Sequence, residues 1–218
     1  YPQIFNDVNN QKAEVILYRP TGESGDFEKA NFPIGVEGGK TSTCPTQNLM
    51  EAYDMKDGTP FVWNNQSNPY DNRDPRMKYT IVCNEMKWPV DPVEIWEGGT
   101  NGLPLQNATT TGYYLKKYVN NTISFEAGST VTKKQHNWVL FRYGEILLNY
   151  AEAMINAFHD PNYKDAVYNM SAREAVNQIR GRTNISLPGF PSDITEKDFV
   201  KRLVKHGQKF GIQKEIAT

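Results

Sequence analysis

The stretch FRYGEILLNYAEAMINA, residues 141–157, is largely apolar and predicts a long helix. Five polar residues interrupt it at spacings of three, four, three and four, which places them in one stripe along a helix of about 3.6 residues per turn. Because the other faces are apolar, we expect the protein to enclose this helix together with its polar stripe. The stripe consists of Arg142, Glu145, Asn149, Glu152 and Asn156.

The charged groups of this stripe need partners if the helix is enclosed, because an unpaired buried charge is costly. We expect Arg142 to pair with Glu145, one turn away, and Glu152 to accept a hydrogen bond from another element. The next helix is predicted at residues 171–183 (SAREAVNQIRGRT), where Ser171 and Glu174 have capping-box spacing. Its candidate partners for the stripe are Asn177, Arg180 and Arg182.

Two functional interpretations of the stripe compete with this structural one. In di-iron carboxylate bundles a glutamate is followed three residues later by histidine, but Leu148 and Ile155 stand three residues after Glu145 and Glu152. A catalytic pair of carboxylates flanks an open cleft, whereas these two glutamates lie two turns apart on one face. The pattern therefore favours polar packing between helices.

The composition excludes several functional classes. The chain has 24 basic and 25 acidic residues and a net charge of −1, so nothing indicates nucleic-acid binding. No apolar stretch approaches the roughly 20 residues needed to span a bilayer. Nucleophile-elbow, zinc-protease and P-loop motifs are absent, and we expect no catalytic residues, metal or cofactor.

Two smaller motifs have ordinary interpretations. Asp54, Asp57 and Gly58 are similar to a calcium loop, but their spacing departs from the EF-hand pattern and favours a plain turn. Cys44 and Cys83 fit no metal or redox spacing; a disulfide is possible, and two inert thiols are favoured.

A long tract rich in Gly, Pro, Asn, Asp and aromatic residues precedes residue 137. Strands are predicted at 13–19 and 77–84, and at 111–119 beside the second of these. Turns are predicted at 54–58 and 68–76. After the tract and the two helices, a third helix is predicted at about 195–210, opened by Thr195 with Asp198 three residues later.

The aromatic residues of the tract stand among amide, carboxylate and glycine residues. A flat ring can contact the apolar C–H face of a sugar while polar neighbours bind its hydroxyls. The alternative is that each ring anchors its loop to the core, as we expect for Trp88, which precedes Pro89, and for Trp138, which opens the helix of 141–157. The candidate ligand-binding residues are Trp96, Trp63, Tyr18 and Tyr70.

The segments HNWVLFRYGEILLNYAEAMINA (136–157) and AVNQIRGRT (175–183) closely resemble the C-terminal half of the SusD/RagB family of Bacteroidetes outer-membrane lipoproteins. Five earlier motifs match the pattern of that family in the same order, so the resemblance covers nearly residues 1–200. They are EVILYRP (14–20), NFPIG (31–35), PTQNLMEAYDMKDGTP (45–60), NPYDNRDPR (68–76) and TGYYLKKY (111–118).

The sequence also departs from the pattern of the family. Residues 182–184 read Arg-Thr-Asn in place of Arg-Ala-Gly, which is a minor change. The family continues its third helix into an Arg- and Glu-rich segment, but residues 201–218 read KRLVKHGQKFGIQKEIAT. We expect residues 1–218 to form a SusD/RagB-like C-terminal domain, a fragment without the N-terminal helical-repeat half and the extreme C-terminus.

The resemblance implies a mainly α fold, a SusD-like helical scaffold with long irregular loops and a few short β-hairpins. It implies a non-enzymatic, surface-exposed protein of the outer membrane, anchored by an N-terminal lipid absent from this chain. Its role would be nutrient uptake in starch or other polysaccharide utilisation: it would capture oligosaccharides and deliver them to a SusC-like TonB-dependent transporter. The alternatives are a glycan hydrolase using Glu94 and Glu97, which flank Trp96, and the same transport role with a peptide ligand.

Overall fold

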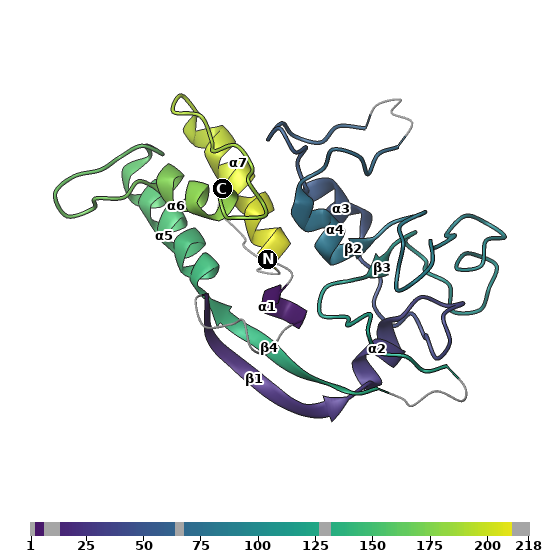
Figure 1. The fold of residues 1–218 in the computed structure, drawn as a ribbon. Coiled ribbons are helices and arrows are strands. Elements are labelled where there is room, and N and C mark those ends of the chain that lie inside the picture. Colours follow the sequence, from purple (N-terminus) through teal and green to yellow (C-terminus); the bar gives the residue numbers. More distant parts are fainter. Residues whose placement is uncertain (1–2, 7–13, 64–67, 127–131, 211–218) are drawn as a thin grey trace. The chain divides into compact units, whose positions relative to one another are not determined.

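The computed structural model describes residues 3–6, 14–63, 68–126 and 132–210 (Figure 1). The chain divides into a first unit, residues 1–50 with 76–140, and a second unit, residues 51–75 with 141–218. Helices exceed strands, and long loops join them, so the predicted mainly α fold is confirmed. The helices are α1 (Gln3–Asn6), α2 (Asp26–Asn31), α3 (Gln47–Ala52), α4 (Pro75–Thr80), α5 (Tyr143–Phe158), α6 (Ala172–Arg180) and α7 (Glu196–Phe210). The strands are β1 (Val15–Ser24), β2 (Ile81–Val82), β3 (Tyr114–Leu115) and β4 (Lys134–Arg142).

The three long helices of the second unit form its core. Both α6 and α7 pack against α5, and their apolar residues recur every three or four positions, as a shared buried face requires. All three helices lie where the sequence predicted them. Their fully buried side chains include Leu148, Ala151 and Ile155 of α5, Ala175, Val176 and Ile179 of α6, and Phe199 and Leu203 of α7.

The predicted capping signals are confirmed at two helix starts. The Ser171 hydroxyl accepts from the Glu174 backbone N–H at 3.2 Å, and the Ser171 backbone N–H donates to Glu174 Oε2 at 2.8 Å. At α7 the Thr195 hydroxyl accepts from the Asp198 backbone N–H at 3.2 Å. These contacts satisfy backbone N–H groups that have no partner within the helix.

The capping box makes a pH-dependent contribution to stability. Hydrogen bonds from Lys164 and then from the Ser171 backbone lower the pKa of Glu174 below its ordinary 4.5. A carboxyl group whose pKa is lower in the folded protein than in the unfolded chain stabilises the fold at pH values above the unfolded-state pKa. This contribution is lost as the pH falls through the folded-state pKa. We expect Glu174→Ala to lower the free energy of unfolding by under about 1 kcal/mol at pH 7, because the side chain is partly exposed.

Urea denaturation at pH 7 and at pH 3 measures this effect. The difference between the native protein and Glu174→Ala should shrink at the lower pH. The variant Lys164→Ala removes the side-chain contact to Glu174 Oε1 (2.8 Å) and keeps the capping box. Its free energy of unfolding should therefore fall by less than that of Glu174→Ala. A difference that is equal at both pH values would contradict the assigned electrostatic origin.

The prediction that the whole polar stripe of α5 is enclosed is wrong. Arg142 is only 4% exposed, but Glu145 and Glu152 are half-buried, and Asn149 and Asn156 are exposed. The helix packs one face against α6 and α7, and its opposite face is exposed even where it is apolar, as at Ile146. Apolar composition around a helix therefore did not mean enclosure on every side.

Polar side chains of α6 organise the segment that follows this helix. Arg180 Nε donates to the Pro188 carbonyl at 2.7 Å, and the Phe190 backbone N–H donates to Asn177 Oδ1 at 2.7 Å. Arg180 also lies 3.7 Å from the Asp54 carboxylate, measured from Nη1 to Oδ2. These contacts fix residues 188–190 against the helical core.

The first half of the strand predicted at 77–84 is a helix. Pro75 occupies the first position of α4, where proline is favoured, and the Thr80 hydroxyl donates to the Arg76 carbonyl at 2.9 Å within the last turn. Only Ile81 and Val82 form a strand, β2. The predicted neighbour is confirmed, because β2 pairs antiparallel with β3, although β3 is limited to Tyr114 and Leu115.

The other sheet joins distant parts of the sequence instead of forming a short hairpin. Strands β1 and β4 pair, and the Thr21 hydroxyl accepts from the His136 backbone N–H at 3.1 Å. The prediction that Trp138 opens a helix is wrong, because this residue lies within β4. It is half-buried, and its ring stacks on His136 with a centroid distance of 5.1 Å.

Two chemical features complete the fold. Cys44 and Cys83 remain thiols and form no disulfide. In the described part of the chain, no helix is long and apolar enough to cross a membrane.

Candidate ligand-binding site

Trp96 lies on a closed loop of the first unit. The Asn101 backbone N–H donates to the Glu94 carbonyl, and the Glu94 backbone N–H donates to Asn101 Oδ1, both at 2.9 Å. The loop leaves no room at Gly102, where a Cβ would lie 2.2 Å from the Trp96 carbonyl oxygen. Trp96 itself is 48% exposed. A fixed backbone thus presents an open aromatic ring, an arrangement that lowers the entropy cost of binding.

The same loop borders a cavity of about 450 Å³ within the first unit. Trp88 is 5% exposed and packs in the core, as predicted. Burial lowers the pKa of Lys116, whose ammonium lies 4.8 Å from the Trp88 ring centroid. The cavity combines apolar and polar walls, as small-molecule sites do. Its lining includes Trp88, Pro92 and Val93 together with Thr100, Asn101 and Asn121.

The two glutamates beside Trp96 have different surroundings. Glu94 Oε2 accepts from the Thr100 backbone N–H at 3.2 Å and from the Thr100 hydroxyl at 3.0 Å, which closes the loop. Glu97 is exposed. Glu94 therefore has a structural role in positioning the ring.

Trp63 and Tyr70 lie in the second unit, where Arg73 connects their segments. Trp63 is 50% exposed, its Nε1 donates to Glu51 Oε1 at 2.6 Å, and its ring makes an edge contact with Phe61 at 5.2 Å. The Arg73 guanidinium lies 3.6 Å from the Phe61 ring centroid and donates to the carbonyl that precedes Tyr70. Trp63 is thus a second exposed ring held in place, whereas Tyr70 is half-buried.

The four predicted binding residues do not belong to one unit. Trp96 and Tyr18 are in the first unit, and Trp63 and Tyr70 are in the second. Tyr18 is exposed on β1. Phe61 and Arg73 were not predicted: Phe61 contacts the Trp63 ring, and Arg73 contacts the Phe61 ring. Their only sequence signal is the closeness of Phe61 to Trp63, two residues apart.

The turn at residues 54–58 has the plain structure that was favoured. Asp57 Oδ1 accepts from the Thr59 backbone N–H at 2.9 Å and from its hydroxyl at 2.7 Å, and these bonds lower the pKa of Asp57. Asp54 faces Arg180 and Arg202, with 3.7 Å to each guanidinium. Across the ranges that the structure describes, no three His, Cys, Asp or Glu side chains group to hold a metal.

Comparisons with known proteins identify relatives of this fold. The model of the SusD family matches residues 4–202. A SusD-like protein from Bacteroides fragilis has a TM-score of 0.74 at 24% identity, with 98% of this chain and 44% of that chain covered. A SusD-like carbohydrate-binding protein from the same species has a TM-score of 0.73 at 21% identity, with 98% and 45% covered. A SusD superfamily protein from Bacteroides vulgatus has a TM-score of 0.59 at 19% identity, with 96% and 40% covered.

The chain therefore spans less than half the length of these solved relatives. No curated protein matches the sequence. The likeness confirms the predicted SusD-like scaffold.

Proposed function

This chain belongs to the SusD family, and from that premise we propose that it is a cell-surface glycan-binding protein. It captures oligosaccharides through exposed tryptophan rings and catalyses no reaction on them. It delivers them to a SusC-like TonB-dependent transporter, from a lipid-anchored position on the outer membrane in the full-length protein. The description of one relative as a carbohydrate-binding protein supports this proposal.

The observation on which the proposal depends is the geometry around Trp96. An exposed ring on a closed loop offers the flat apolar surface that the C–H face of a pyranose can contact. Thr100 and Asn101 of the same loop line the adjoining cavity and supply groups that can bind hydroxyls. Stacking and oriented hydrogen bonds are the two elements that a sugar site needs.

We expect Trp96→Ala to weaken glycan binding by about tenfold or more, because it removes a stacking surface worth about 1–3 kcal/mol. The free energy of unfolding should change little, since the ring is half-exposed. Isothermal titration of the native and variant proteins against a panel of neutral oligosaccharides measures the difference. Trp63→Ala, which removes the second exposed ring, should show a smaller loss.

The comparison variant is Trp88→Phe: Trp88 is buried and lines the cavity, the phenyl ring keeps an aromatic wall there, and we expect a smaller loss of binding than for Trp96→Ala if the variant folds. Normal binding by Trp96→Ala, together with lost binding by a folded Trp88→Phe, would reverse the roles of the two residues. Incubation with each polysaccharide, followed by an assay for new reducing ends, examines catalysis separately. Sustained release of reducing ends would overturn the binding-only proposal and favour Glu94 and Glu97 as catalytic groups.

A further inference from the structure

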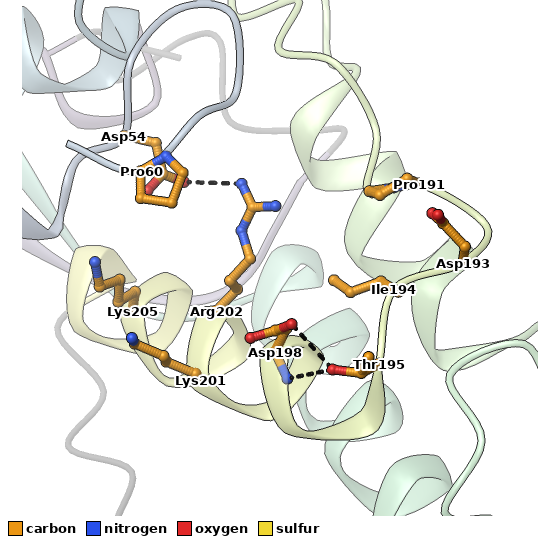
Figure 2. Close-up of a pocket in the computed structure, with 10 residues that line it drawn as sticks. All are labelled: Asp54, Pro60, Pro191, Asp193, Ile194, Thr195, Asp198, Lys201, Arg202 and Lys205. Atoms are coloured by element: carbon orange, nitrogen blue, oxygen red, sulfur yellow. Dashed lines mark hydrogen bonds and ion pairs between the residues drawn. The ribbon is translucent and has the colours of Figure 1, made fainter. Parts of the chain in front are cut away.

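A second cavity of about 450 Å³ lies within the second unit (Figure 2). It is bounded by α7, by residues 54 and 60 and by the segment 191–195. Three of its lining residues are apolar, and most of the others are charged. The lining residues are Asp54, Pro60, Pro191, Asp193, Ile194, Thr195, Asp198, Lys201, Arg202 and Lys205.

Several charges of this lining already have internal partners. Asp198 Oδ2 accepts from the Thr195 hydroxyl at 3.0 Å. Arg202 Nη2 lies 3.7 Å from Asp54 Oδ2 and also donates to the Gly58 carbonyl. These groups hold the cavity walls together, so their charges are largely compensated within the protein.

Lys201 and Lys205 differ from these groups. They lie one turn apart on α7, and Figure 2 shows both side chains on the same side of that helix, while Asp198 turns toward Thr195. Within the described residues, neither ammonium group has a hydrogen-bond or ion-pair partner. Like charges at this spacing repel each other, and an anion bound between them would remove the repulsion.

We propose that this cavity binds a carboxylate-bearing sugar, a hexuronate residue of an acidic glycan, with its carboxylate at Lys201 and Lys205. Pro60, Pro191 and Ile194 provide the apolar wall for the sugar ring. Asp193 lies across the view from the two lysines in Figure 2, where its carboxylate can accept hydrogen bonds from sugar hydroxyls. The choice of a sugar rests on the proposed function, whereas the anion site rests on the two lysines.

The test is isothermal titration with glucuronate, with glucose as the neutral analogue and inorganic phosphate as a plain anion. Lys201→Gln/Lys205→Gln should weaken glucuronate binding about tenfold or more. The matched control, Lys40→Gln/Lys133→Gln, removes the same charge at two exposed positions of the first unit and should bind as the native protein does. Thermal melts confirm that both variants are folded.

Preferential binding of glucuronate over glucose, lost only in the cavity variant, supports the assignment. Equal losses in both double variants, or none in the cavity variant, would overturn it. Phosphate binding as tightly as glucuronate, with the same loss, would also overturn it and leave a general anion site. If neutral glycans bind through Trp96 but glucuronate does not bind, only the hexuronate site fails; if no glycan binds, the proposed function fails too.

Discussion

Arg180→Ala is expected to lower the free energy of unfolding by about 3–5 kcal/mol, because it breaks a buried network within the second unit. Arg180 is 1% exposed. Its Nε donates to the Pro188 carbonyl at 2.7 Å, and its Nη1 lies 3.2 Å from His206 Nε2 and 3.7 Å from Asp54 Oδ2. Alanine would leave a buried carboxylate and a carbonyl without this cation, and a large cavity beside them.

Urea denaturation followed by circular dichroism measures the loss. Arg180→Lys keeps the charge but loses the planar guanidinium group, which lies 4.5 Å from the Phe190 ring centroid. Its free energy of unfolding should therefore lie between those of the native protein and Arg180→Ala. Gln178→Ala, at an exposed position on the same helix, should change the free energy by no more than about 0.5 kcal/mol. A loss below about 1 kcal/mol for Arg180→Ala would show that the network contributes little.

The long helices of the second unit were predictable because their signals are local. Apolar spacing marks α5 and α6, and Ser171 with Glu174 marks where α6 begins. The partner of Arg180 was not predictable, since Asp54 comes from a turn far earlier in the chain. The segment 77–84 was wrongly predicted because a short apolar run is compatible with either a strand or a helix turn. Pro75, at the first position of α4, favours the helix.

The candidate sites show the same limit. A glycine-rich loop next to Trp96 was sufficient to expect an exposed ring, and Trp96 is exposed. The sequence brings Phe61 near Trp63 but does not predict that Arg73 covers the Phe61 ring, because that contact is tertiary. No sequence pattern indicated a site at Lys201 and Lys205, because the other walls of their cavity come from residues 54 and 60 and from the segment 191–195.

The first unit contains a comparable buried contact at Glu28. This residue of α2 is 0% exposed, and its Oε1 lies 2.9 Å from His136 Nε2 of β4. The same oxygen accepts from the Asn120 backbone N–H at 3.0 Å. One carboxylate therefore connects a helix, a strand and a turn from three separate parts of the sequence, and no local pattern in the sequence indicated this role.

Glu28→Ala is therefore expected to lower the free energy of unfolding by about 3 kcal/mol, since the Asn120 N–H and His136 would lose a buried partner. Glu28→Gln keeps an acceptor oxygen on a side chain of similar size, so its free energy of unfolding should fall by less. Denaturant melts of both variants measure the difference, and Glu23→Ala, at an exposed position of β1, is the matched control. A loss for Glu28→Ala no larger than that for Glu23→Ala would mean that the carboxylate does not hold these three segments together.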